Sequence, residues 1–183
     1  MDTTKISSTF TVRQYREHRD NGNREAIADL IFERLYERYL EPFKNNPAKH
    51  GFSMMASGCL MTEAFYCYKK GRKKTGVAGG VAFEEFFTES TYLKPFLGYG
   101  NEFYKNIRCG ILHQGETYDG WKVVRKGSLF QKSTKTINAT KYLEALESEL
   151  KGFVSELKEE PISSRAWKAI IKKLDHICDN CDA

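Results

Sequence analysis

Apolar side chains recur every three or four residues along most of this chain of 183 residues, which is the pattern of amphipathic helices. The pattern predicts helices over residues 24–40, 52–70, 81–89, 101–114, 139–160 and 164–177. Pro42, Gly71, Gly115 and Pro161 follow four of these segments, and such residues commonly end helices. Asn138 precedes the fifth segment and is a suitable N-cap.

Two parts of the chain lack the helical period. Residues 1–23 are polar and predict an arm or a weak first element. Within residues 119–136, two short runs separated by Lys126 and Gly127 predict a β-hairpin. The expected fold is therefore all-α, with about six helices and a small hairpin inserted after the 101–114 helix. The length suits a single domain over residues 1–183.

The composition narrows the setting in which the protein works. No run approaches the roughly 18 apolar positions of a membrane span, and the first ten residues lack the order of a signal peptide. Five cysteines, an odd number scattered along the chain, are typical of reduced thiols. We therefore expect a cytoplasmic protein that does not associate with membranes.

Positive charge is concentrated in one part of the chain. The net charge is +5, and residues 104–135 alone hold seven basic and two acidic side chains. An anionic partner such as nucleic acid fits this distribution. The basic residues placed to contact such a partner are Lys105, Lys122, Arg125 and Lys126.

Arg108 and His113 share the 101–114 helix and are the candidates for chemistry. Five residues of helix separate two side-chain directions by ~140° and ~7.5 Å along the axis, so one helix does not easily point both at one atom. Arginine is long, and His113 lies in the last turn before Gly115, so convergence in one chain is feasible. A symmetric dimer in which two copies of the helix cross offers a second route.

The two side chains suit the cleavage of a phosphodiester without a metal. An imidazole removes the proton of a ribose 2′-hydroxyl or protonates the leaving 5′-oxygen, while a guanidinium stabilises the charge on the phosphorane. The simpler interpretation is that Arg108 forms a salt bridge and that His113 interacts with the dipole at the helix C-terminus.

The run NIRCGILHQGET, residues 106–117, resembles the R-x-x-x-x-H signature of the HEPN superfamily of small helical domains. The resemblance implies a homodimer formed through the motif helix and, in active members, metal-independent RNA cleavage, often in toxin–antitoxin or defence systems. Arg108 and His113 occupy the two signature positions and inherit the catalytic roles. RNA, a second copy of the chain and an antitoxin or regulatory protein are the implied partners.

Two alternatives remain open at this stage. Active HEPN members often have a polar residue directly after the arginine, where this chain has Cys109. A non-catalytic HEPN module that binds nucleic acid or a partner protein is therefore the main alternative. A plain interaction protein, in which the motif is coincidental, is the other.

Smaller patterns have plainer interpretations. The basic run over residues 69–74 suits a phosphate backbone or a solvated helix end, and we favour the latter. Gly79 and Gly80 predict a flexible turn. Cys178 and Cys181 have the spacing of half a zinc site without an obvious fourth ligand, so we expect a frayed tail with two thiols. The sequence predicts no metal and no cofactor.

Overall fold

The computed structural model describes residues 3–44, 47–48 and 50–182, and it is mainly helical, as the apolar periodicity predicts. Each predicted segment is helical. The longer helices are α1 (Val12–Asp20), α2 (Arg24–Tyr39), α3 (Gly51–Lys70), α4 (Gly79–Glu89), α7 (Ala139–Glu159) and α8 (Arg165–Asp182). The segment with the signature consists of α5 (Gly100–Phe103), a π-helical turn (Tyr104–Cys109) and α6 (Gly110–Gln114). Short 3₁₀ turns lie at Glu41–Phe43, Lys94–Phe96 and Lys132–Thr134.

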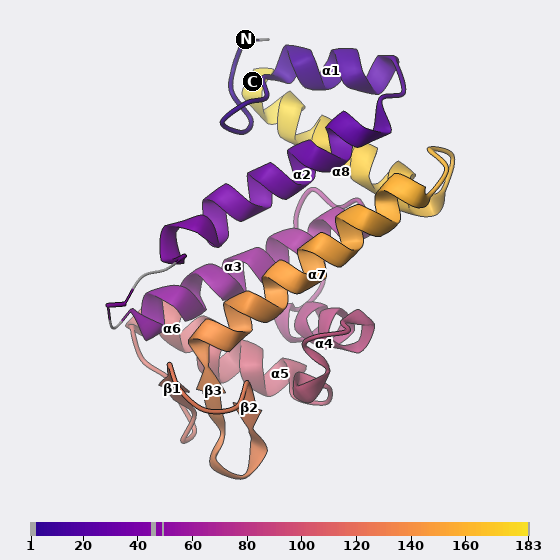
Figure 1. Cartoon of the computed structure of the whole chain (residues 1–183). Coiled ribbons are helices and arrows are strands. Elements are labelled where there is room, and N and C mark those ends of the chain that lie inside the picture. The colour runs from indigo at the N-terminus through magenta and orange to yellow at the C-terminus, as the bar shows by residue number, and fades with distance from the viewer. Residues whose placement is uncertain (1–2, 45–46, 49, 183) are drawn as a thin grey trace.

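Helices α3 and α7 pack against each other through the middle of the molecule, and α2 contacts both (Figure 1). Helices α1 and α8 contact each other at one end of this group, while α4 to α6 and the strands lie at the other end. Helix α3 is central because apolar side chains on several of its faces are buried, among them Met55, Cys59 and Phe65. This helix also contacts α6 and the π turn, so it forms the support of the signature segment.

Part of the predicted N-terminal arm is a packed helix. Thr11 and Gln14 form a capping box at the start of α1, in which each side chain bonds the other residue's backbone nitrogen. Val12 and Tyr15 are fully buried. These two are the only buried residues of α1 in the described part of the chain. Because so few positions are buried, the helix leaves little apolar periodicity in the sequence.

The predicted hairpin over residues 119–136 is wrong in its pairing. Strands β1 (Lys122–Val124) and β2 (Phe130–Gln131) do not pair with each other, because β3 (Thr136–Asn138) lies between them, parallel to β1 and antiparallel to β2. The buried side chain of Ile137 gives β3 the central place. Asn138 donates a hydrogen bond to the carbonyl of Gly127 and also caps α7, as its position predicts.

Aromatic rings attach this sheet to the helices. Phe130 of β2 stacks on Phe96 and on Trp121, with centroids 4.7 and 5.4 Å apart. Phe103, at the end of α5, meets the edge of Trp121 and stacks on Tyr142 of α7. The strands are therefore held against the same helix that carries Arg108.

Glycines allow α4 to approach the signature segment closely. Gly79 and Gly80 form the first turn of α4 and not the flexible turn that the sequence predicts. A Cβ atom at Gly80 would lie 2.0 Å from the side chain of Asn101, and one at Gly100 would lie 2.4 Å from the backbone nitrogen of Glu84. The carboxylate of Glu84 accepts hydrogen bonds from the backbone of Gly98 and Gly100, at 2.7 and 2.6 Å.

The C-terminal cysteines are part of α8 and not of a frayed tail. Cys178 is buried to 1% exposure, and burial raises the pKa of its thiol to about 11. Cys181 donates a weak hydrogen bond to the carbonyl of Ile177. The helix continues because Cys178 extends the apolar stripe of Trp167, Ile170 and Leu174. No helix in the described part of the chain has the length and apolar character to cross a membrane.

Candidate active site

The signature lies on a helix that is not regular. The motif helix, which we define as residues 100–114, changes from α to π geometry at Tyr104 and returns to α at Gly110. In a π turn the backbone bonds join residues five apart, so the backbone of Cys109 follows that of Tyr104 by one turn. Such turns are frequent at functional sites. The helix ends at Gly115, which has a φ of +72° and is the left-handed cap that the sequence predicts.

Arg108 is held by an acidic residue of α3. Its Nη2 donates to Oε2 of Glu63 at 3.0 Å, and the two side chains are 20% and 16% exposed. The guanidinium also lies 5.4 Å from the centroid of the Tyr104 ring. Partial burial lowers the pKa of Arg108, but the hydrogen bond and charge of Glu63 outweigh this and the pKa is raised. The buried Nε has no hydrogen-bond partner among the described residues.

His113 has a different environment. It is exposed in the last turn of α6, directly before the cap at Gly115. Within the described part of the chain, no hydrogen bond or ion pair joins His113 to Arg108 or to an acidic side chain that would orient the ring. The imidazole is therefore open to solvent, whereas the guanidinium lies against α3.

The basic residues predicted to contact nucleic acid divide into two groups. Lys105 is exposed on the π turn. Lys122 in β1 and Lys126 just after it are exposed at the sheet. Arg125 lies between them, and its guanidinium donates to the hydroxyl of Thr140 at 3.2 Å and to the carbonyl of Ala48. The side chains of Lys122 and Lys126 are thus exposed to solvent, whereas the side chain of Arg125 is hydrogen-bonded to α7.

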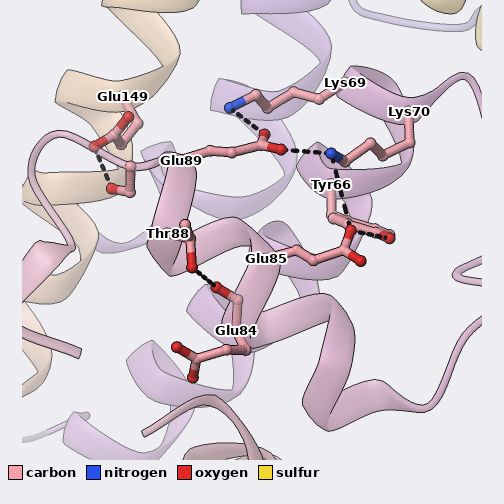
Figure 2. Close-up of polar contacts among 9 residues, drawn as sticks. Tyr66, Lys69, Lys70, Glu84, Glu85, Thr88, Glu89 and Glu149 are labelled. Carbon is pink, nitrogen blue, oxygen red and sulfur yellow. Dashed lines mark hydrogen bonds and ion pairs between the residues drawn. The ribbon is translucent and has the colours of Figure 1, made fainter. Parts of the chain in front are cut away.

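The basic run over residues 69–74 is partly neutralised within the fold. Figure 2 shows Lys69 and Lys70 at the end of α3 reaching the carboxylate of Glu89 on α4, at 3.1 and 2.5 Å. In the same view Glu85 accepts the hydroxyl of Tyr66, at 2.9 Å, while Glu84 points away from it. These cations join α3 to α4, so the run is not simply a solvated helix end.

Glu63 is the residue of the site that the sequence did not single out. A usable signal was present, because Glu63 is the one charged residue between positions 51 and 68, in a helix predicted to be largely buried. A carboxylate in such a helix needs a cation or several donors. Its partner is 45 residues away in the chain, and the periodicity of α3 gives no information about it.

Comparisons with known proteins assign no family. A scan against protein-family models finds no match, and searches of curated proteins and of solved structures find no significant similarity. Across residues 3–44, 47–48 and 50–182, no three His, Cys, Asp or Glu side chains gather as they would around a metal ion.

Proposed function

We propose that this protein is a metal-independent endoribonuclease of the HEPN type that acts as a homodimer. The observation that carries the proposal is the exposed imidazole of His113 at the capped end of a helix that also holds the guanidinium of Arg108. The spacing of the two residues resembles the HEPN signature. The π turn at Arg108 supports the proposal, since such turns are frequent at functional sites.

The reaction follows from the chemistry of the two side chains. Neutral His113 accepts the proton of a ribose 2′-hydroxyl, and the 2′-oxygen attacks the adjacent phosphorus. The bond from phosphorus to the 5′-oxygen breaks as an imidazolium protonates that oxygen, giving a 2′,3′-cyclic phosphate and a 5′-hydroxyl. Arg108 stabilises the charge on the non-bridging oxygens. A dimer supplies the second histidine that this scheme requires.

An exposed apolar residue beside the motif helix supports dimerisation. Leu60 is 41% exposed and lies one turn before Glu63 on α3, which places both side chains on the same face. Leu112, on α6, is half-buried. Two copies that meet at this face would form a two-fold contact and bring both motif helices together.

Cleavage of labelled RNA in EDTA tests the proposal. We expect His113→Ala to lower the cleavage rate by about 10²–10⁴-fold through loss of the acid–base group. Arg108→Ala should lower it by roughly 10²–10³-fold through loss of charge stabilisation. His176→Ala is the matched control, because His176 lies on α8, away from the motif helix. Intact RNA with the wild-type protein, or cleavage by both variants at the wild-type rate, contradicts the proposal.

A non-catalytic module that binds RNA or a protein is the second candidate. The ion pair between Arg108 and Glu63 favours it, because a guanidinium held by a carboxylate is less available to a phosphate. The exposed ring of His113, without an orienting partner among the described residues, favours it too. RNA that is bound but not cut in the same assay would select this function.

A further inference from the structure

A groove with a volume of about 720 Å³ lies between the first turn of α3 and strand β1. Its walls are formed mainly by Gly51, Phe52, Val123, Val124, Arg125 and Lys126. Phe52 and Val124 are 39% and 37% exposed, which is high for apolar side chains of this size. The groove therefore presents an aromatic and aliphatic floor to solvent.

The groove is open because of how β1 sits in the fold. In the order β1-β3-β2, one side of β1 has no neighbouring strand from the described residues. Gly51 allows α3 to begin close to this strand, since a Cβ atom there would lie 3.2 Å from a methyl group of Val123. The ring of Phe52 has no ring-to-ring contact among the described residues. It is therefore available to stack on a planar group.

The charge at the groove is positive. Lys126 lines the groove and is exposed, and Lys122 is exposed on β1 outside the lining. No ion pair to a described acidic residue neutralises either of them. The guanidinium of Arg125 adds a second positive charge at the wall. Aromatic side chains that stack on bases, combined with cations that face the backbone, are the features by which proteins bind single-stranded nucleic acid.

The groove and Arg108 lie on the same side of α3. Phe52 precedes Glu63 by 11 residues, which corresponds to about three full turns with only ~20° of difference in direction and ~16 Å along the axis. Helix α3 contacts both β1 and α6, and Figure 1 shows the end of α6 and β1 near the same end of α3. A strand of a few nucleotides that occupied the groove would continue toward the motif helix.

We propose that this groove binds single-stranded RNA, with Phe52 stacked on a base and Lys126 facing the phosphate backbone. The choice of RNA as the ligand rests on the proposed function. The groove holds the strand outside the reacting centre, so Phe52 and Lys126 are binding residues with no part in the proton transfers.

Binding of a labelled 2′-O-methyl oligonucleotide tests the inference, since this strand lacks the nucleophilic hydroxyl and is not cut. We expect Phe52→Ala to weaken the Kd about tenfold, the effect of one lost stacking contact. The slope of log Kd against log salt should not change. Lys126→Ala should reduce that slope by about 0.7, as the loss of one phosphate contact does for a single strand. Phe52→Trp should restore affinity.

Tyr92→Ala is the matched control, because Tyr92 is an exposed aromatic residue at a different cavity, between α4 and α7. Equal affinities for wild type, Phe52→Ala and Tyr92→Ala would overturn the inference, as would an unchanged salt slope in Lys126→Ala. A groove that bound an extended peptide along β1, and not RNA, would give these equal RNA affinities. If the wild type binds through Phe52 but never cuts RNA, the groove stands and the ribonuclease proposal fails. If the wild type cuts RNA and Phe52→Ala binds the strand with wild-type affinity, the ribonuclease proposal stands and the groove proposal fails.

Discussion

The side chain of Arg108 is 20% exposed, and its guanidinium is met by the carboxylate of Glu63 from another helix. Burying one of these charges alone would cost several kcal/mol, so each accounts for the presence of the other. The same pair also decides what Arg108 can do for a substrate. A phosphate that binds Arg108 has to compete with Glu63 or share the guanidinium with it, because arginine offers five donors.

Replacing Glu63 tests this competition. We expect Glu63→Gln to tighten binding of the 2′-O-methyl strand by up to about fivefold, the range of a partly exposed ion pair. The gain should disappear in the double variant with Arg108→Ala. Glu85→Gln is the control, because Glu85 bonds Tyr66 and not the motif helix. Unchanged affinity in Glu63→Gln would indicate that Arg108 stabilises the fold through Glu63 and does not contact the bound strand.

At the scale of elements, the motif helix is placed by close backbone packing together with side-chain contacts. Gly100 lies against the backbone of α4, and the carboxylate of Glu84 accepts the amides at the start of α5. The edge-to-face contact of Phe103 with Trp121 holds the sheet on the same helix. Any shift of α5 would therefore move the π turn together with the sheet and its exposed lysines, Lys122 and Lys126.

Gly100→Ala should disturb this contact. The added methyl group would come within 2.6 Å of Glu84 atoms, so we expect a loss of about 1–3 kcal/mol in the free energy of unfolding. Gly152→Ala on α7 is the control, since a Cβ there meets no atom within 4 Å, and it should stabilise by about 0.5–1 kcal/mol. Urea unfolding followed by circular dichroism measures both. Equal midpoints for the two variants would contradict the close packing.

For the whole molecule, one face of α3 connects three features of the proposed site. Phe52 lines the groove, Leu60 is the exposed apolar residue and Glu63 holds Arg108, and their spacing of eight and three residues keeps them on one stripe. The signature alone describes only the motif helix. The fold adds a face where a second copy and a nucleic acid strand would meet the motif helix.

Leu60→Glu tests the dimer. A charge in an apolar two-fold contact is repeated in both copies, so we expect a monomer in size-exclusion chromatography with light scattering and loss of RNA cleavage. Ile162→Glu, at an exposed apolar residue between α7 and α8, should leave both unchanged. A wild-type protein that is strictly monomeric, or a Leu60→Glu dimer with full activity, would oppose the dimeric site.

The sequence by itself determined the helical segments after residue 23 and the caps at Asn138 and Gly115, because periodicity and capping act within a few residues. It did not determine α1, which has few buried positions. It also located the cluster of positive charge and the signature. Tertiary structure decided that β3 lies between β1 and β2, since strand pairing joins segments with similar short patterns and the burial of Ile137 selects among them. It likewise decided that Glu63 holds Arg108 while His113 faces solvent, because an ion pair forms between neighbours in space and is not recorded in local spacing.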